Sequence, residues 1–263
     1  MNIMQLAQRG MPLKELTVID CHAHLGQSDL GHVLCESAAD MVRCMDALGV
    51  DACVISSFLA IGRDPVGGND EVAKAIRDYP GRFIGYAGVN PRKQEAVIPE
   101  LERCFDNLGM TAVKLHPVYH GYIIQDPICV PVFEFADERR CPVLCHDFGD
   151  PGFIKRTAET YPNMKLIPAH VALGGPRSEH SELLRITADH ENIFLDPAFS
   201  RVPYRTIEKM VEIAGEDKVL YGSDSPFLSM SYQIGKVLFA DIDDNAKRKI
   251  LGENAVNVFG LEL

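Results

Sequence analysis

The sequence predicts an α/β protein whose single domain is a distorted (β/α)₈ barrel (TIM barrel), and three observations support this fold class. Short β-rich runs alternate with longer amphipathic stretches along the chain, a pattern typical of βα units and a parallel sheet. The runs number eight, and eight parallel strands can close into a barrel that leaves no edge unpaired. No Gly/Ser linker, charge block or low-complexity segment divides residues 1–263, so we expect one domain.

The strands are predicted from apolar runs at residues 17–25, 52–58, 83–89, 111–117, 142–146, 165–170, 193–197 and 219–223. Apolar residues at helical spacing follow each run, near 38–48, 69–79, 94–108, 129–139, 152–161, 179–190, 204–214 and 229–238. A further helical segment at 243–259 closes the chain.

Capping residues support two of these helices. Ser37 precedes the pattern at 38–48 and Gly49 follows it, as expected for an N-cap and a left-handed C-terminal stop. Asn69 is the predicted start of the next helix, and Pro80-Gly81 its stop.

The composition disfavours several classes of protein. The net charge of −11 leaves no excess of Lys and Arg, which disfavours a nucleic-acid binder because such binding depends on neutralising phosphates. No run of 18 apolar residues is present, and the first ten residues do not read as a secretory signal. The eight cysteines include no C-x-x-C pair. We therefore expect reduced, mostly buried thiols in a cytoplasmic protein.

Polar side chains end several of the predicted strands. They are His22 and His24 on the first, Lys114 and His116 on the fourth, His146 on the fifth, His170 on the sixth and Asp224 after the eighth. The carboxyl ends of the strands carry the active site in an α/β barrel. These residues, distant in sequence, should therefore converge around one axis.

The spacing of His22 and His24 indicates a metal site. One residue separates them, so a strand would project both imidazoles to the same side. His146 and Asp224 can supply further nitrogen and oxygen ligands for a divalent ion such as zinc. Each residue also has an ordinary explanation: a histidine ending an apolar run can be a hydrogen-bonded core-edge residue, and Asp224 in GSDSP can belong to a turn.

The remaining histidines are expected outside the ligand set. His180 and His190 lie on or beside a polar helical segment, where they would be solvated. His32 and His120 fall in loops after the first and fourth strands, so they could line the pocket.

Eight motifs together resemble the amidohydrolase superfamily, and more closely its branch of small metal-dependent amidohydrolases related to aminocarboxymuconate-semialdehyde decarboxylase. They are VIDCHAHLG, RFIGYAGVNP, VKLHP, CPVLCHDFG, KLIPAHVALGG, NIFLDPA, LYGSDSPF and ENAVNVFG. They stand in family order and cover nearly the whole chain. The resemblance implies a distorted barrel of the metal-dependent hydrolase type with a metal at its mouth.

The resemblance also implies roles for individual residues. His22, His24, His146 and Asp224 would be metal ligands, and His170 would bind a second metal or contact the metal-bound water. We expect one divalent metal rather than two, zinc in the first place and manganese as the alternative.

Lys114 stands where some superfamily members carry a carboxylated lysine that bridges two metals. It could equally be a substrate-binding cation or a lysine snorkelling at the barrel rim.

Metal-assisted hydrolysis of a small carboxylic ester, lactone or amide is the leading hypothesis. A divalent ion lowers the pKa of its bound water from ~15.7 toward ~7, and the hydroxide would attack the carbonyl carbon. Asp224 would take the proton and pass it to the leaving group, while His170 would orient or deprotonate the water.

Two other readings stay open on the same scaffold. The first is non-oxidative decarboxylation of a small unsaturated or aromatic carboxylic acid by a lyase, which would use the same ligands. The chain is short for the decarboxylases of this branch, which weakens the expectation of that specific activity. The second is a barrel that binds metal without catalysis.

Loop residues near the expected barrel mouth are candidates for binding a small, anionic substrate, because arginine in particular pairs well with carboxylates. They are Arg63, Asn90, His116, Tyr119, His120, Tyr122 and Arg201. A homodimer is possible, and residues 1–16 could pack on the barrel or on a partner subunit.

Overall fold

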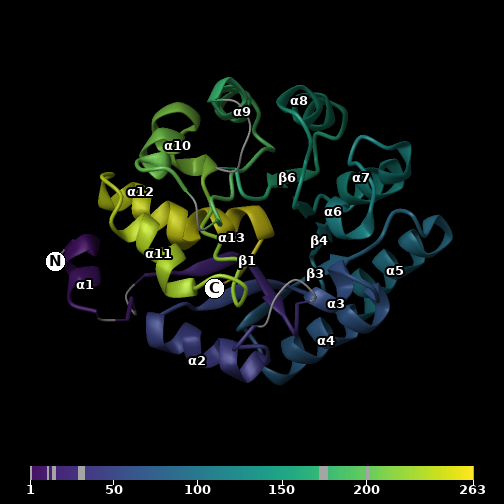
Figure 1. The fold of residues 1–263 in the computed structure, drawn as a ribbon, viewed down its shortest axis with the longest axis horizontal. Helices are drawn as coiled ribbons and strands as arrows, with labels where there is room; N and C mark the ends of the chain where they lie inside the picture. Colours follow the sequence, from purple (N-terminus) through teal and green to yellow (C-terminus); the bar gives the residue numbers. More distant parts are fainter. Residues whose placement is uncertain are drawn as a thin grey trace.

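Six parallel strands lie side by side in chain order and curl around the centre of the molecule (Figure 1). They are β1 (Ile19–Leu25), β2 (Ala52–Ser57), β3 (Phe83–Gly88), β4 (Ala112–Leu115), β5 (Pro142–Cys145) and β6 (Lys165–Pro168). The computed structural model describes residues 2–10, 12–13, 16–28, 33–171, 177–199 and 202–262, without the side chains of 177–180.

Extended segments at the predicted seventh and eighth strands continue the sheet back to β1. Single parallel bridges join neighbouring segments at the pairs Leu166–Ile193, Leu195–Val219 and Ala23–Ser225. These two segments are less regular than predicted, and Pro197, which has no N–H to donate to a ladder, stands at the end of the first of them. The predicted (β/α)₈ barrel is confirmed in a distorted form, with the last two strands reduced to isolated bridges.

Helices surround the sheet in the order of the chain (Figure 1). Those that the sequence predicts are α2 (Ala38–Leu48), α4 (Pro65–Asp78), α5 (Gln94–Asn107), α7 (Val130–Glu138), α8 (Pro151–Thr160), α9 (Arg177–Asp189), α10 (Thr206–Ala214) and α11 (Met230–Leu238). The segment predicted at 243–259 is helical throughout, as α12 (Asp244–Arg248), a π-helical turn (Lys249–Glu253) and α13 (Asn254–Phe259).

Short elements that the sequence pattern did not reveal are α1 (Ile3–Gln8), α3 (Phe58–Ile61), α6 (Pro117–His120) and the 3₁₀ turns Pro127–Cys129 and Glu216–Lys218. Each spans six residues or fewer, which is too short to display a hydrophobic period. Two of them, α3 and α6, follow directly on strands and contribute to the site described below.

The barrel interior is apolar at one end and polar at the other. Inward side chains of the strands pack with α13 in one cluster, which includes Ile19, Cys21, Val54, Tyr86, Ala112, Leu144, Ile167, Leu220, Ala255, Val258 and Phe259. Side chains two residues apart on a strand share a face. Lys114 therefore follows Ala112 on the inner face, and His146 follows Leu144. The barrel floor is a hydrophobic core, and the carboxyl ends of its strands carry the polar groups.

One predicted cap is confirmed and another is wrong. The Ser37 side chain accepts the N–H of Asp40, and Gly49 ends α2 in the left-handed conformation. Asn69, by contrast, does not begin a helix, because α4 starts at Pro65 with Asp64 as its N-cap. The glycines before Asn69 suggest a loop, yet a Cβ at Gly68 would overlap the backbone of Ala60. Glycine there permits the close contact between α3 and α4.

The N-terminal helix α1 packs on the barrel of its own chain. Ile3 is buried, and its N–H donates to the carboxylate of Asp244 at 3.2 and 3.3 Å. This is the first of the two arrangements expected for residues 1–16. All eight cysteines are free thiols, and only Cys35 and Cys44 are partly exposed.

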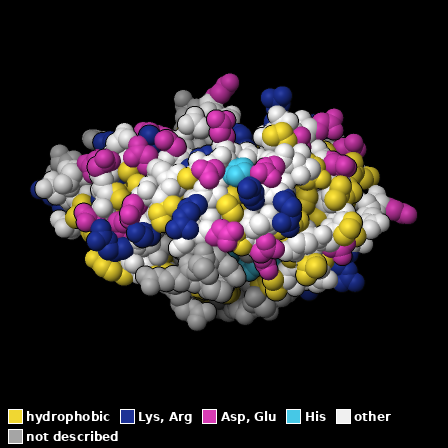
Figure 2. Space-filling view, turned by 90° about the horizontal axis from the view of Figure 1, so that it is seen from above, with side chains coloured by type: hydrophobic (Ala, Val, Ile, Leu, Met, Phe, Trp, Pro, Cys, Tyr) yellow, Lys and Arg dark blue, Asp and Glu magenta, His cyan; other side chains and the backbone are white. Residues whose placement is uncertain are grey.

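On the face shown in Figure 2, acidic and basic side chains are interspersed over the described surface. Exposed ion pairs of the molecule include Lys74 with Asp78 and Arg139 with Asp106. Within the described part of the chain, no helix is long and apolar enough to span a membrane.

Candidate functional site

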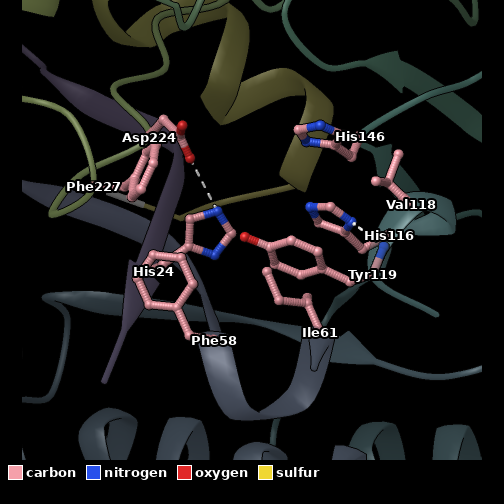
Figure 3. A pocket seen from close by; sticks show the side chains of 9 residues that line it. All are labelled: His24, Phe58, Ile61, His116, Val118, Tyr119, His146, Asp224 and Phe227. Carbon is pink, nitrogen blue, oxygen red and sulfur yellow. Dashed lines mark hydrogen bonds and ion pairs between the residues drawn. The ribbon is translucent and has the colours of Figure 1, made fainter. Parts of the chain in front are cut away.

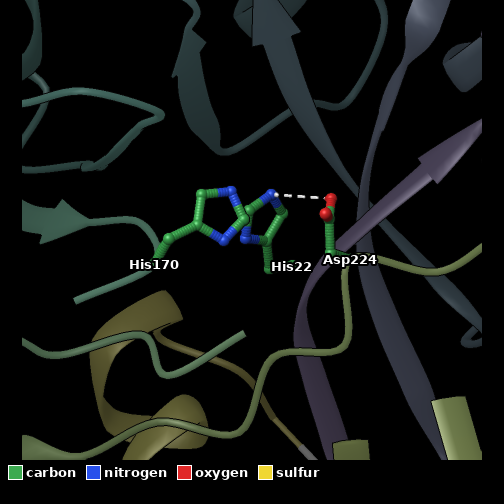
Figure 4. A group of neighbouring side chains, drawn as sticks. All are labelled: His22, His170 and Asp224. Carbon is green, nitrogen blue, oxygen red and sulfur yellow. Dashed lines mark ion pairs between the residues drawn. The ribbon is translucent and has the colours of Figure 1, made fainter. Parts of the chain in front are cut away.

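Three side chains from distant parts of the chain meet at the carboxyl end of the barrel (Figure 4). His22 lies on β1, His170 follows β6, and Asp224 precedes the bridge that returns the eighth segment to β1. One nitrogen or oxygen atom of each lies within 4.8 Å of the others. Imidazole nitrogen and carboxylate oxygen are donors that zinc and manganese accept, so this group could hold a divalent ion.

His24 adds a fourth donor to the group. Its Nε2 atom lies 3.1 Å from Oδ1 of Asp224 and 3.2 Å from Nε2 of His22. The Nε2 atom of His22 is 3.5 Å from the same Asp224 oxygen. The predicted convergence of the two strand-β1 histidines on Asp224 is therefore present in the structure.

A partner holds the other nitrogen of each of three imidazoles. Nδ1 of His22 donates to Oδ2 of Asp196 at 2.6 Å, and Nδ1 of His170 donates to the carbonyl of Ala198. Nδ1 of His24 lies 2.9 Å from the hydroxyl of Ser56. Such outer contacts orient imidazole ligands and fix which nitrogen is free. The Nε2 atoms are thus the ones turned to the centre.

The backbone at the site is strained in two places. His170 and Asp224 both have left-handed backbone angles, with φ of 58° and 57°, which are unusual for residues other than glycine. Strain of this kind persists only where the surroundings impose it. At Asp224 the backbone N–H donates to the carbonyl of His22, and this bond fixes the carboxylate-bearing loop to β1.

The Asp20 carboxyl group joins the first strand to the eighth segment through hydrogen bonds. Its Oδ1 accepts the N–H groups of His22 at 3.1 Å and of Ser223 at 2.9 Å, and its Oδ2 accepts the Ser223 hydroxyl. Burial raises the pKa of Asp20 to about 7, although the bonds to Ser223 and His22 oppose the rise. Asp20 therefore supports the backbone of the site and does not reach its centre.

Lys114 is buried beside the donor group. Its Nζ atom lies 2.9 Å from Nε2 of His22. Burial lowers the pKa of Lys114 to about 8, and the charges of Asp224 and Asp196 act in the opposite direction. The structure thus places a buried amine next to a candidate ligand.

His116, Tyr119 and His146 form a stack at one side of the site. The His116 ring lies 4.0 Å from the Tyr119 ring and 4.1 Å from the His146 ring, with interplanar angles of 12° and 16°. The N–H of Tyr119 donates to Nδ1 of His116 at 3.2 Å, so neutral His116 carries its proton on Nε2. His146 also lies edge-on to His170, with ring centroids 4.8 Å apart.

Burial keeps the stacked imidazoles neutral. It lowers the pKa of His146 to about 3, with a further lowering by His170 and Lys114. It also lowers the pKa of His116 far below its usual range, and His146 adds to the effect. Both rings are therefore uncharged at neutral pH in the absence of a bound anion.

A small pocket of about 130 Å³ opens onto these groups (Figure 3). Its polar wall contains His24, His116, His146 and Asp224, and its remaining wall is formed by Phe58, Ile61, Val118, Tyr119 and Phe227. Phe58 stacks on the ring of His24 with centroids 4.7 Å apart. The pocket thus combines an apolar wall with imidazole and carboxylate groups on one side.

Several predicted substrate-binding residues lie away from this pocket. Arg63 is exposed, Asn90 accepts the N–H of Arg92, and Nε2 of His120 bonds to the carbonyl of Gly62 at 3.0 Å. The hydroxyl of Tyr122 is buried. Tyr119 and His116 do line the pocket. Arg201 and His32 lie outside the described residues, as does the side chain of His180.

Sequence reasoning missed several residues of the site. Asp196 and Ser56 hold imidazoles, and Phe58, Ile61 and Phe227 form the apolar wall. Asp196 lies one residue before the end of the predicted seventh strand, in LDP, and Ser56 follows Val54 at inward spacing, so both carried a positional signal. The apolar wall carried none, because α3, which holds Phe58 and Ile61, is too short to recognise and Phe227 lies in a turn.

A family model and a curated relative both match most of this chain. The family model described as amidohydrolase matches residues 19–261. A 2-amino-3-carboxymuconate-6-semialdehyde decarboxylase from Dictyostelium discoideum is 25% identical over 235 residues, which are 74% of this chain. The match spans 66% of the length of that relative.

Solved structures share the fold at low sequence identity. A 2,6-dihydroxybenzoate decarboxylase in complex with 2,6-dihydroxybenzoate has a TM-score of 0.75 and 15% identity, covering 94% of this chain and 100% of its own. A 5-carboxyvanillate decarboxylase from Novosphingobium aromaticivorans, with manganese and 4-hydroxy-3-methoxy-5-nitrobenzoic acid, has a TM-score of 0.73 and 15% identity. It covers 96% of this chain and 99% of its own.

These relatives correct the leading functional expectation. Hydrolysis of an ester, lactone or amide is the wrong reading, because the curated relative and the two enzymes of like fold are named as decarboxylases. The ligand residues could not reveal this, since both reactions use the same donor set. Zinc as the first choice of metal also lacks support, since the bound metal named in the like structure is manganese.

Proposed function

Because the chain belongs to the amidohydrolase family, whose model spans residues 19–261, we propose that it is a metal-dependent enzyme that decarboxylates a small anionic acid without oxidation. The observation that carries this proposal is the convergence of His22, His24, His170 and Asp224 beside a pocket with an apolar wall. The decarboxylases among its relatives support the choice of reaction.

The donor atoms fit a divalent ion. The nitrogen of His22 that faces away from the centre is bonded to Asp196, which leaves its Nε2 atom unprotonated and able to bind metal. We propose His22, His24 and Asp224 as ligands of one ion, manganese or zinc, and His146, which lines the same pocket, as the fourth ligand because the motif CPVLCHDFG resembles the family's. When bound, the ion supplies positive charge and a coordination position for a substrate oxygen.

The pocket suits a single planar ring. A cavity of about 150 Å³ is known to accept benzene, and the volume here is about 130 Å³. Phe58, Tyr119 and Phe227 can pack on the ring faces and exclude water from the breaking bond. We therefore infer a small aromatic or unsaturated carboxylic acid, like the 2,6-dihydroxybenzoate bound to the structural relative.

Two imidazoles can bind the substrate carboxylate and supply the proton. The Nε2–H group of His116 turns toward His24 across the pocket (Figure 3) and can donate a hydrogen bond to the substrate carboxylate. As the bond to the carboxylate carbon breaks, its electron pair stays on the substrate carbon, which must take a proton. His170 can hold that proton on Nε2, because its Nδ1–H is bonded to the Ala198 carbonyl.

A direct assay tests the proposal. The purified protein is loaded with manganese or zinc and supplied with 2,6-dihydroxybenzoate, 5-carboxyvanillate and 2-amino-3-carboxymuconate-6-semialdehyde, and released carbon dioxide is measured. We expect release from at least one acid, abolished by chelation and in Asp224→Asn. Hydrolysis of esters or lactones without carbon dioxide release would contradict the proposal. Metal binding without turnover of any acid would instead indicate a non-catalytic barrel.

A further inference from the structure

The segment from Asp196 to Phe199 contacts two imidazoles of the site without lying at its centre. The Asp196 carboxylate accepts from His22 at 2.6 Å, and the Ala198 carbonyl accepts from His170. On the other side, Nζ of Lys236 donates to the carbonyls of Pro197 and Phe199 at 3.0 and 2.6 Å. The segment is thus held between α11 and the donor group.

Both oxygens of Asp196 are committed to donors. Oδ1 accepts the N–H of Ala198 at 2.9 Å, and Oδ2 accepts Nδ1–H of His22. Asp196 is completely buried, so no water can replace either bond. Burial raises the pKa of Asp196, while the charges of His170 and Lys114 and the bond from Ala198 act in the opposite direction. In its ionised form the carboxylate only accepts hydrogen bonds, and this pairing then requires the proton of neutral His22 to be on Nδ1.

The tautomer of His22 decides whether it can bind a metal. A proton on Nδ1 leaves a lone pair on Nε2, the atom that faces His24 and Asp224. In the structure Lys114 donates to this same Nε2 atom at 2.9 Å, which agrees with an unprotonated Nε2. Ser56, the partner of His24, can donate or accept, so it imposes no such choice on its histidine.

Gly222 packs directly against the carboxylate of Asp196. A Cβ built on Gly222 would overlap Oδ1 of Asp196 and would lie 3.0 Å from Cβ of His22. Glycine at this position lets the eighth segment pass directly against the Asp196–His22 pair.

We propose that Asp196 is a positioning residue that fixes the Nδ1–H tautomer of His22 and thereby determines the metal affinity of the site. This inference rests on the metal binding proposed above. Asp196 touches neither metal nor substrate, and acts through the ring of His22.

Asp196→Asn is the sharpest test, because it keeps the shape of the side chain. One of its two terminal atoms becomes an NH₂ donor. If that group faces His22, it favours the tautomer with the proton on Nε2, which blocks metal binding. The other orientation would set the NH₂ group against the backbone N–H of Ala198, two donors in a buried place, so we expect the NH₂ group to face His22. Loss of such a partner typically lowers metal affinity about 10–100-fold, and we expect that range here.

Asp20→Asn is the matched control. Asp20 is equally buried and close to His22, but it bonds to the backbone N–H and not to the ring. Its amide oxygen can accept both backbone N–H groups, and its NH₂ can donate to the Ser223 hydroxyl. The change replaces a fully buried carboxyl group beside His22 and leaves the His22 tautomer alone, so we expect metal affinity within about threefold of the unaltered protein.

The readouts are the manganese and zinc dissociation constants by competition with a chelator, and the imidazole tautomers of the metal-free protein by ¹⁵N NMR. Gly222→Ala provides a second variant that displaces Asp196 without changing charge, with Gly235→Ala as its control because nothing lies near that position. We expect the His22 ring to be protonated on Nδ1 in the unaltered protein and on Nε2 in Asp196→Asn.

Four outcomes would overturn the inference. Asp196→Asn could bind metal as tightly as the unaltered protein, or His22 could keep its tautomer in the variant. Equal losses in Asp196→Asn and Asp20→Asn would indicate a general effect of replacing a buried carboxyl group beside His22. If the unaltered protein bound no metal at all, the proposed function would fail together with this inference. If it bound metal and only the Asp196 results disagreed, the inference alone would fail.

Discussion

The Nζ atom of Lys114 lies 2.9 Å from Nε2 of His22, and this contact joins β4 to β1 across the mouth of the barrel. Both side chains are buried. The amine bonds to the one His22 nitrogen that Asp196 leaves free, so a metal ion must displace it from that atom. The Lys114 amine thus competes with a metal ion for Nε2 of His22, unless Lys114 itself binds the metal.

Lys114→Met distinguishes these two roles. A buried cation repels a divalent ion nearby, so we expect the variant to bind about one metal per chain, at least as tightly as the unaltered protein. Metal analysis after gel filtration, with and without bicarbonate, measures this. A fall from two metals to one in the variant would show instead that Lys114 bridges a metal pair as a carboxylated lysine.

Single replacements of His146 and His170 test which of the two residues is the metal ligand and which is the proton donor. The two rings are 4.8 Å apart, so both lie close to the site. We expect His146→Ala to lose metal affinity by about 100-fold or more. We expect His170→Ala to keep its metal and lose turnover by about 10²–10⁴-fold. Calorimetry measures the metal affinity of each variant, and carbon dioxide release measures its turnover. Loss of metal in His170→Ala and not in His146→Ala would make His170 the ligand and His146 the proton donor.

Phe227→Ala probes the apolar wall of the pocket. Phe227 is 45% exposed, so its removal should change the free energy of unfolding by less than about 1 kcal/mol. A substrate ring that packs on it would lose contact, and we expect KM to rise about tenfold. Phe239, which is 54% exposed and does not line the pocket, is the matched control. Equal effects of Phe227→Ala and Phe239→Ala on KM would place the substrate elsewhere.

Asp20 should make the stability of the metal-free protein fall between about pH 4 and pH 7. Burial raises the pKa of Asp20 from 3.8 to about 7. The folded state then binds more protons than the unfolded state in this window, so the stabilisation present below pH 3.8 is lost as the pH rises through about 7. The linked change is on the order of 4 kcal/mol.

Asp20→Asn removes this titration, and urea unfolding at several pH values compares the two proteins. We expect the stability of the variant, relative to the unaltered protein, to increase from pH 4 to pH 7. A constant difference across that range would mean that Asp20 is ionised throughout, with no raised pKa.

The order of strands and helices was predictable because it depends on local patterns. Each strand is a short apolar run, each long helix has apolar residues at helical spacing, and Ser37 and Gly49 cap α2 as their types favour. The start of α4 was wrongly predicted at Asn69 because glycines usually interrupt helices, and two of them precede this residue. Gly68 is instead required by the close contact with Ala60. Only the packing of α3 on α4 decides that position.

The sequence by itself determined the barrel and the convergence of His22, His24, His170 and Asp224, because the carboxyl ends of parallel strands necessarily meet. Only the tertiary structure decided which partners those groups have. It placed Asp196 behind His22 and stacked His116 on His146, and it turned His120 toward Gly62. Such contacts join segments far apart in the chain, and their geometry depends on packing that no local pattern records.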